Sequence, residues 1–248
     1  WSTKASSMLD MSALFFIRFF DNHGLLQIKN RPDWWVIRGG SKEYVKKLVS
    51  SFKEKIRLSS PVLSITRKDE KVEIKLRNGK DQIESFDAVV IATHSNQALR
   101  LLSDKTSLEK EILGALPYQK NEALLHTDHT VLPKNKLAWA SWNYNLDQDS
   151  EEPVALTYNM NILQSFTAAE TFCVTLNSNG LINPSKVIKK LKYDHPLFTI
   201  EGIAAQKRKH EISGVNNTYF CGAYWRNGFH EDGVVSALDI AKQFGIFL

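Results

Sequence analysis

The chain has 248 residues, of which 43% are hydrophobic and 24% are charged, an ordinary balance for a soluble folded protein. Its net charge of +5 is spread along the chain among acidic residues, which argues against nucleic-acid binding. Cys173 and Cys221 lie far apart without a Cys-x-x-Cys motif, so a zinc cluster built on cysteines is excluded and a reducing, cytoplasmic compartment is favoured.

The first predicted element is a helix over residues 7–20, which ends before Asp21-Asn22-His23-Gly24. Its most apolar run, Ala13–Phe20, is broken by Arg18 and is much shorter than the roughly 20 residues that span a bilayer. We therefore expect no transmembrane segment here and a helix that faces a core. Peripheral membrane contact through the phenylalanines is the alternative.

A turn and a second helix follow. Trp34–Ile37 reads as a short strand, Gly39-Gly40 as a tight turn, and Ser41 as the cap of a helix. The apolar stripe of that helix is predicted to be Tyr44, Val45, Leu48, Val49 and Phe52.

Three strands are predicted next, at Pro61–Ile65, Val72–Leu76 and Gln82–Ser85, the last two joined by an Asn78-Gly79 hairpin turn. Asp87–Ala92 is a continuous apolar run, which suits a strand buried on both faces.

After that strand, a helix is expected from Asn96 to Leu102. His94, at the strand end, could act as an acid or base, but a lone histidine there is more often a structural group.

From Ser107 the pattern changes to a short helix, Leu108–Leu113, and then to β-like stretches separated by turns such as Asn145–Pro153. We expect a mostly antiparallel sheet with one further helix, Pro184–Tyr193, whose apolar face carries Val187, Ile188 and Leu191. The expected strands are 122–126, 137–143, 154–158 and 171–176.

The last thirty residues are the most informative. A strand, Thr218–Cys221, leads into Gly222-Ala223, a glycine-punctuated loop, and a helix beginning near Val234. In α/β sheets, free backbone N–H groups and the positive end of a helix dipole meet beyond the strand ends, where electron-rich ligands bind. A plain connection is the alternative, because such junctions are common.

Two other kinds of site are not supported. His126 and Asp128 share one face of a predicted strand while His129 points away, and two ligands do not make a closed metal site, so no metal is expected. No Gly-x-Ser-x-Gly elbow of a serine hydrolase occurs.

The closing segment Cys221-Gly-Ala-Tyr-Trp, with Gly228-Phe-His-Glu-Asp-Gly-Val and Ser236-Ala, resembles the C-terminal signature of a bacterial family of predicted NAD/FAD-binding proteins. That family belongs to the flavin-containing amine oxidase superfamily. The other stretches that carry the resemblance are Trp34-Trp-Val-Ile-Arg-Gly-Gly-Ser, Ile91-Ala-Thr-His-Ser-Asn-Gln-Ala-Leu, Leu125-His-Thr-Asp, Ala138-Trp-Ala-Ser-Trp-Asn-Tyr and His195-Pro-Leu-Phe.

The resemblance implies a mixed α/β and α+β fold. It joins an incomplete FAD/NAD(P)-binding domain of the amine-oxidase kind to a mostly antiparallel β substrate domain. The implied division is 1–33 as a helical segment of the substrate or cap region, 34–105 with 215–248 as the C-terminal part of the FAD-binding domain, and 106–214 as the substrate domain.

The same resemblance implies an FAD-dependent oxidoreductase that transfers hydride between flavin and an organic substrate, either an amine or an unsaturated, lipid-like molecule. Backbone N–H groups at the start of the closing helix would stabilise negative charge on the reduced flavin, and Glu231 and Asp232 would also cap that helix. Aromatic side chains would face the substrate at Trp142, Tyr224 and Trp225, whereas Trp139 is expected in the core. The implied cofactor-binding residues are Gly39, Gly40, Ser41, Val62, Ala92, Thr93, Gly222, Ala223, His230, Glu231, Asp232, Gly233 and Val234.

One part of such a flavoprotein is missing, because no Gly-x-Gly-x-x-Gly occurs anywhere in the chain. In the resembling family, Trp-Ser lies well inside the protein, whereas here Trp1-Ser2 opens the sequence. We therefore expect the C-terminal part of a longer flavoprotein, which by itself does not retain FAD. The alternative is a non-catalytic binding module that keeps the fold. The sequence gives no catalytic base and no oligomeric state.

Overall fold

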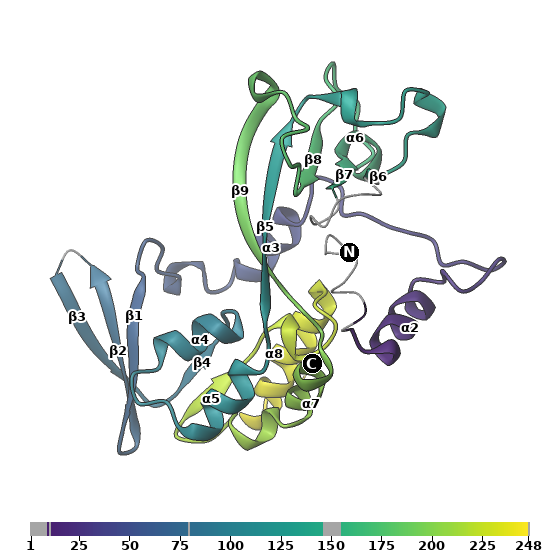
Figure 1. Cartoon of the computed structure of the whole chain (residues 1–248). Coiled ribbons are helices and arrows are strands. Elements are labelled where there is room, and N and C mark those ends of the chain that lie inside the picture. Colours follow the sequence, from purple (N-terminus) through teal and green to yellow (C-terminus); the bar gives the residue numbers. More distant parts are fainter. Residues whose placement is uncertain (1–8, 10, 79, 146–154, 248) are drawn as a thin grey trace. The chain divides into compact units, whose positions relative to one another are not determined.

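The computed structural model describes residues 9, 11–78, 80–145 and 155–247. The chain forms two compact units (Figure 1). The first unit comprises Trp1–Asp10, Ile28–Lys53 and Gln119–His195, and the second comprises Met11–Gln27, Glu54–Tyr118 and Pro196–Leu248. These boundaries differ from the predicted division: residues 34–53 belong to the first unit, whereas residues 106–118 and 196–214 belong to the second.

The first unit is built on a five-stranded sheet in the order β6-β7-β8-β5-β9. Neighbouring strands from β6 to β5 pair antiparallel, so the predicted antiparallel sheet is confirmed. The short helix α6 (Met160–Leu163) follows β7. Of the predicted elements here, residue 154 and most of the 145–153 turn lie outside the described residues. The strands are β5 (Tyr118–His126), β6 (Trp142–Asn145), β7 (Ala155–Asn159), β8 (Cys173–Leu176) and β9 (Val187–Pro196).

Two predictions for this sheet are wrong. The predicted helix at Pro184–Tyr193 is a 3-10 turn followed by β9, which is the edge strand. The lysines of this run suggested a solvated helix face, but exposed lysines also protect the edge of a sheet against further pairing. The predicted strand at 137–143 begins only at Trp142, because residues 136–138 form a 3-10 turn held by Asn135.

Residues 34–37 also differ from the prediction, because they form no strand and their side chains are exposed. Gly39 and Gly40 do form the predicted turn, with φ of +84° and +86° and a hydrogen bond from the Gly40 N–H to the Ile37 carbonyl. Helix α3 (Lys42–Val49) follows, but the Ser41 side chain makes no capping hydrogen bond. Its predicted apolar stripe stays largely exposed.

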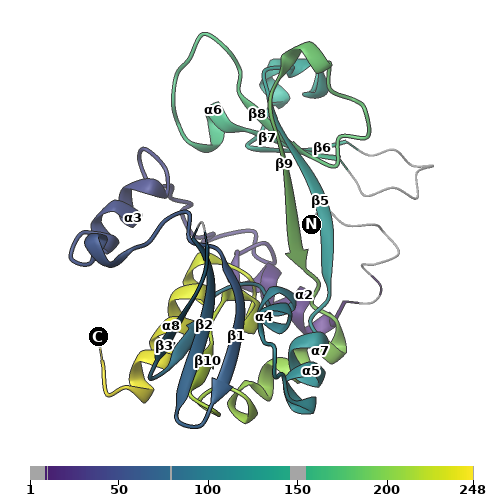
Figure 2. The ribbon, with the colours of Figure 1, turned by 90° about the vertical axis from the view of Figure 1, so that its left-hand side faces the viewer.

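The second unit contains a three-stranded antiparallel sheet, β1 (Val62–Lys68), β2 (Lys71–Asn78) and β3 (Lys80–Phe86), whose strands lie side by side in Figure 2. Alternation places Val72 and Leu76 in the core while Glu73 and Lys75 turn the other way. The sequence predicted all three strands. Gly79, in the predicted hairpin turn, lies outside the described residues.

A separate parallel pair, β4 (Val89–Ile91) and β10 (Thr218–Phe220), joins distant parts of the chain. Thr218 pairs with Val89 and Phe220 with Ile91. The expected burial of β4 on both faces is wrong at Val90, which is 45% exposed while Val89 and Ile91 are buried. A run of apolar residues does not reveal whether one face of a strand is covered or both.

Helices cover the core of this unit. The predicted helices near 96–102 and 108–113 are confirmed, whereas α7 was not predicted. The closing helix begins at His230, earlier than predicted, so Glu231, Asp232 and Gly233 lie inside its first turn. The helices are α2 (Ala13–Asn22), α4 (Ser95–Leu101), α5 (Ser107–Gly114), α7 (Ile200–Lys207) and α8 (His230–Gln243).

Helix α2 departs from its predicted core-facing role. Among its residues only Phe15 is buried, stacked on Phe198 with ring centroids 4.4 Å apart. Leu14 and Ile17 are each 54% exposed. In the part of the chain that the structure describes, no helix is both long enough and apolar enough to cross a membrane.

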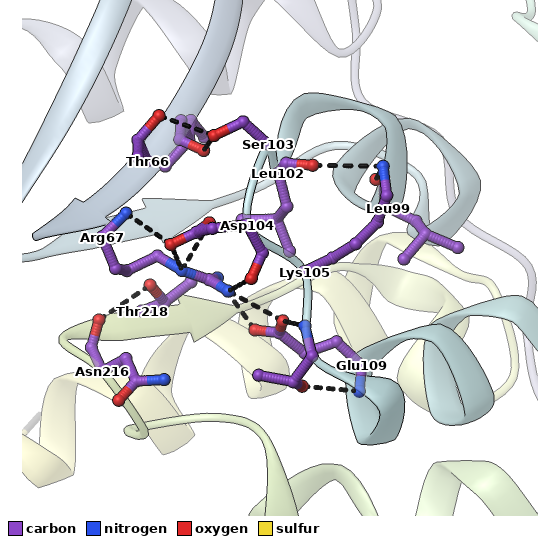
Figure 3. A network of polar contacts seen from close by, with 12 residues as sticks. Thr66, Arg67, Leu99, Leu102, Ser103, Asp104, Lys105, Glu109, Asn216 and Thr218 are labelled. Carbon is purple, nitrogen blue, oxygen red and sulfur yellow. Dashed lines mark hydrogen bonds and ion pairs between the residues drawn. The ribbon is translucent and has the colours of Figure 1, made fainter.

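An almost fully buried ion pair joins β1 to α5 (Figure 3). The two guanidinium nitrogens of Arg67 each donate to one carboxylate oxygen of Glu109 at 2.8 Å, and both side chains are nearly inaccessible. Arg67 also contacts Asp104. Glu109 accepts the Thr106 N–H as well, so the same carboxylate caps α5.

A buried histidine organises the core of the first unit. His126 accepts the Asp128 N–H at Nδ1, so its proton sits on Nε2 and is donated to Thr175 Oγ1, 2.7 Å away. Burial lowers the pKa of His126, although the nearby Asp128 carboxylate opposes the shift. Residues 126 and 128 therefore serve the fold through these hydrogen bonds.

This arrangement predicts a pH-dependent stability. Because the folded-state pKa is lowered, only the unfolded chain binds this proton between the folded-state value and the ordinary value of about 6.5. The contribution of neutral His126 to the unfolding free energy is complete above about pH 6.5, the ordinary value, and is lost as the pH falls below it. Urea unfolding from about pH 7 to pH 5 should show a decline in unfolding free energy that is shallower in His126→Gln. Substitution of the exposed His210 by Gln should leave the decline unchanged, and equal slopes for the wild type and His126→Gln would contradict the assignment.

Candidate functional site

The candidate site lies at the carboxyl edge of the parallel pair in the second unit. Both β4 and β10 end there, because parallel strands point the same way, and the Cys221 N–H extends the pairing to the Ile91 carbonyl at 3.1 Å. Ala92 and Thr93 follow β4 and lead into α4, while Gly222 and Ala223 follow β10 and lead toward α8. Helices thus begin beyond both strand ends.

The amino end of α8 is held by its own acidic residue. The Asp232 carboxylate accepts the Phe229 N–H at 2.9 Å and is buried, which confirms the capping role predicted for it. Phe229 packs near two residues of α2, with ring centroids 5.9 Å from Phe19 and 5.4 Å from His23. An aromatic cluster therefore flanks this helix start.

Gly222 is required by the packing of its neighbour. A Cβ atom at this position would lie 2.5 Å from Cε1 and 2.8 Å from Cδ1 of the Tyr224 ring, well inside van der Waals contact. The absence of a side chain lets Tyr224 fold back over the chain, where it is buried beside Trp225 with ring centroids 5.0 Å apart.

A polar chain ties this loop to α8. The Gly222 N–H donates to Ser236 Oγ at 3.1 Å, and Lys209 Nζ donates to the same oxygen at 3.2 Å. The Lys209 ammonium also lies 5.8 Å from the centre of the Trp225 ring. Burial lowers the pKa of Lys209, partly offset by Asp239 and Cys221. The loop after β10 is therefore fixed from both sides.

Unpartnered polar atoms gather around the two strand ends. After β4, His94 Nδ1, Ser95 Oγ and Asn96 Oδ1 are buried without a hydrogen-bond partner in the described part of the chain. After β10, the buried Tyr224 Oη and Trp225 Nε1 make no hydrogen bond of full geometry, although the two side chains interact with each other. Buried polar groups are normally paired, and leaving one unpaired costs about 1–3 kcal/mol. Five such atoms in two short segments are available to hydrogen-bond a polar ligand or ordered water.

Tyr118, the first residue of β5, contacts the segment that follows β4. Its hydroxyl accepts the Ser95 N–H at 2.9 Å, and its ring stacks on His94 with centroids 4.8 Å apart. Burial, reinforced by Tyr118, raises the pKa of Tyr224 far above its ordinary value. Tyr224 therefore stays protonated at physiological pH and can act as a neutral hydroxyl donor.

The structure brings most of the predicted site residues into one unit. Ala92, Thr93, Gly222 and Ala223 lie at the shared strand edge, and His230, Glu231, Asp232, Gly233 and Val234 form the start of α8. Val62 begins β1 in the same unit. Gly39, Gly40, Ser41 and Trp142 belong to the first unit, where Trp142 packs edge-on against Trp34 at 5.3 Å.

Sequence reasoning missed several residues that shape this site. Ser95, Asn96 and Tyr118 were not singled out, and Lys209 lies in a segment with no motif. Ser236 was quoted as part of the closing signature without a role, although a serine on the first turns of α8 was the signal available.

The sequence profile of the family described as "Flavin containing amine oxidoreductase" matches residues 5–152. No curated protein matches the chain at significance.

Several solved structures are similar in fold. The CLA-producing fatty acid isomerase from P. acnes matches with a TM-score of 0.59 and 14% identity, covering 84% of this chain and 52% of its own. Cyclohexylamine oxidase from Brevibacterium oxydans IH-35A matches with a TM-score of 0.56 and 13% identity, covering 96% of this chain and 61% of its own. Wild-type putrescine oxidase bound to putrescine matches with a TM-score of 0.55 and 9% identity. The match covers 83% of this chain and 53% of the putrescine oxidase chain. The chain thus spans between half and about three fifths of these neighbours.

The mixed α/β fold with antiparallel sheets is shared with these solved structures. With a family profile that matches more than half of its residues, the chain belongs to the flavin containing amine oxidoreductase family.

Proposed function

We propose that this chain forms part of an FAD-dependent oxidoreductase in which hydride passes between the flavin and an organic substrate. The observation that carries the proposal is the group of five unpartnered buried polar atoms at the carboxyl edge of β4 and β10. Ligands of α/β sheets bind at that edge. Family membership supplies the kind of ligand.

The residues present fit a flavin dinucleotide. Ser95, Tyr224 and Trp225 offer O–H and N–H donors, and His94 and Asn96 offer acceptors, a mixed set suited to phosphate oxygens, ribose hydroxyls and a heterocyclic ring. When bound, the flavin supplies the two-electron chemistry.

This chain's own residues would bind and orient the cofactor. Ala92, Thr93, Gly222 and Ala223 are small enough for backbone to approach a phosphate closely. The amino end of α8, at His230, Glu231, Asp232, Gly233 and Val234, would favour negative charge on a reduced flavin. The rings of Tyr224 and Trp225 would exclude water.

The assignment of Gly39, Gly40, Ser41 and Val62 to the cofactor, and of Trp142 to the substrate, stays a prediction. The proposal also includes a cytoplasmic location and membership of the bacterial branch described above. Two buried free cysteines support a reducing compartment.

The proposal includes two classes of substrate. An amine is supported by the cyclohexylamine and putrescine oxidases among the structural neighbours, and an unsaturated, lipid-like molecule by the fatty acid isomerase. Peripheral membrane contact would accompany the second.

The ADP half of FAD is proposed to be held by a segment outside this sequence. The 248 residues contain no Gly-x-Gly-x-x-Gly, and the structural neighbours are considerably longer than the chain. The same absence favours a second candidate, a binding module that keeps the fold without catalysis.

Absorption spectra distinguish the two candidates. Protein expressed from the complete reading frame that contains this sequence is expected to be yellow, and the 248-residue chain alone to be colourless. A colourless complete protein that still binds a partner would support the binding module, whereas stoichiometric FAD on the 248-residue chain would contradict the role given to the outside segment.

A further inference from the structure

A second candidate site lies in the first unit. A cavity of about 520 Å³ is bounded by residues 120–122 of β5, by Lys192 and Asp194 of β9, and by the turn at residues 177–180. Strands β5 and β9 run side by side in both views of the ribbon (Figure 1, Figure 2). Its volume falls in the range of small-molecule sites, and none of the flavin-site features described above belongs to it.

The charges at the cavity favour an anion. Of its four charged side chains, Glu122 is already paired with Lys190. Lys120, Lys192 and Asp194 form no ion pair with any described residue. Two unpaired lysines against one unpaired carboxylate leave the cavity net positive.

The wall of the cavity is held in place before any ligand binds. Asn121 Oδ1 accepts hydrogen bonds from Gln119 Nε2 and from Asn177 Nδ2, each at 2.9 Å. This orients the amide so that Asn121 Nδ2 donates to His195 Nδ1. Asn121 and Asn177 are buried, and the Asn177 N–H also donates to the Glu122 carbonyl at 2.9 Å. The turn is therefore pinned to β5 by side-chain and backbone bonds.

The rest of the lining is polar. Ser178 is buried, and Asn179 and Gly180 adopt positive φ of +49° and +81°, which places their backbone in the left-handed region. The lysine side chains and the Ser178 hydroxyl offer donors, whereas no aromatic or large aliphatic side chain lines the cavity. Such a lining suits a compact ligand with several oxygen acceptors and disfavours a hydrocarbon chain.

We propose that this cavity binds a small organic carboxylate, with Lys120 and Lys192 as its charged partners and the pinned 177–180 turn as a hydrogen-bonding wall. The Asp194 carboxylate repels a bound anion, so ligands with a high negative charge are disfavoured. The proposal does not depend on flavin, because the cavity and all its contacts lie within the first unit.

Calorimetric titration of the 248-residue chain with succinate tests this site, with uncharged succinamide as the matched probe. We expect saturable succinate binding and none by succinamide. The double substitution Lys120→Gln/Lys192→Gln should weaken binding about tenfold or more, the scale of losing charge-assisted hydrogen bonds. The control Lys186→Gln/Lys189→Gln removes the same charge from exposed lysines outside the cavity and should change the affinity less than about twofold.

Asp194→Asn gives a prediction of opposite sign, because removing the repelling carboxylate should tighten succinate binding. Single substitutions of Lys120 and Lys192 repeat the test if the double variant does not fold. The proposal is overturned if no saturable binding occurs, if succinamide binds equally well, or if both double variants weaken binding equally. Binding of n-butylammonium that Asp194→Asn abolishes would likewise overturn it, since the site would then recognise a cation.

Discussion

Arg67→Met is expected to lower the unfolding free energy of the second unit by about 3–5 kcal/mol, the usual cost of leaving one partner of a buried ion pair alone. The Glu109 carboxylate would then face an apolar side chain. Because only 4% of the Glu109 side chain is exposed, solvent could not compensate for the lost partner. Urea unfolding, with hydrogen exchange at the α5 amides, measures the loss.

Two further variants make this result specific. Arg57→Met breaks an exposed ion pair with Glu84 that has comparable distances, and it should have a much smaller effect because solvent screens that pair. The double variant Arg67→Met/Glu109→Met should recover much of the stability, since replacing both charges by apolar groups is often neutral. Equal losses from Arg67→Met and Arg57→Met would show that burial does not set the cost.

Gly222→Ala adds a single methyl group, and we expect it to lower the stability of the candidate site more than the same addition at its other glycines. The added Cβ would overlap the Tyr224 ring at 2.5 Å, so the ring or the loop after β10 must move. Overpacking of this kind costs about 1–3 kcal/mol, and displacement of Tyr224 should also change its near-ultraviolet circular dichroism. In the complete protein, the flavin should be retained less well.

Gly114→Ala is the matched control, because the nearest atom to its Cβ would be Leu99 Cδ2 at 4.0 Å, an ordinary contact. Its stability should be unchanged or slightly higher, as expected for alanine in a helix. If Gly222→Ala unfolds at the same denaturant concentration as the wild type, the Tyr224 ring does not depend on this glycine.

Local patterns predicted much of the fold. The hairpin strands β1 to β3 alternate with a period of two, and strong turn residues separate them. The strand–glycine–helix order after Thr218 predicted β10 and a helix after it, although not that β10 pairs with β4. These features depend on residues close together in the sequence.

The errors arose where tertiary position decides the structure. Residues 187–196 carry apolar and lysine residues at a spacing that suits either a helix or an edge strand, and pairing within the sheet selects the strand. Residues 34–37 have strand-forming side chains but no strand partner among the described residues. Helix α8 starts earlier than predicted because Asp232 caps Phe229.

The chemistry of the site was less accessible still. Its position followed from the motif, but the unpartnered atoms of Ser95 and Trp225 become visible only when distant segments meet. Lys209 and Ser236 converge on Gly222 from elements that no local pattern connects. The Arg67–Glu109 pair joins positions far apart in the chain.

The most direct test of the central claim is the molar ratio of FAD to protein, measured after denaturing release from protein made from the complete reading frame. We predict a ratio near one, with a clearly lower ratio in Gly222→Ala than in Gly114→Ala. A complete, folded protein that neither carries nor takes up FAD would contradict the claim that the carboxyl edge of β4 and β10 holds a flavin.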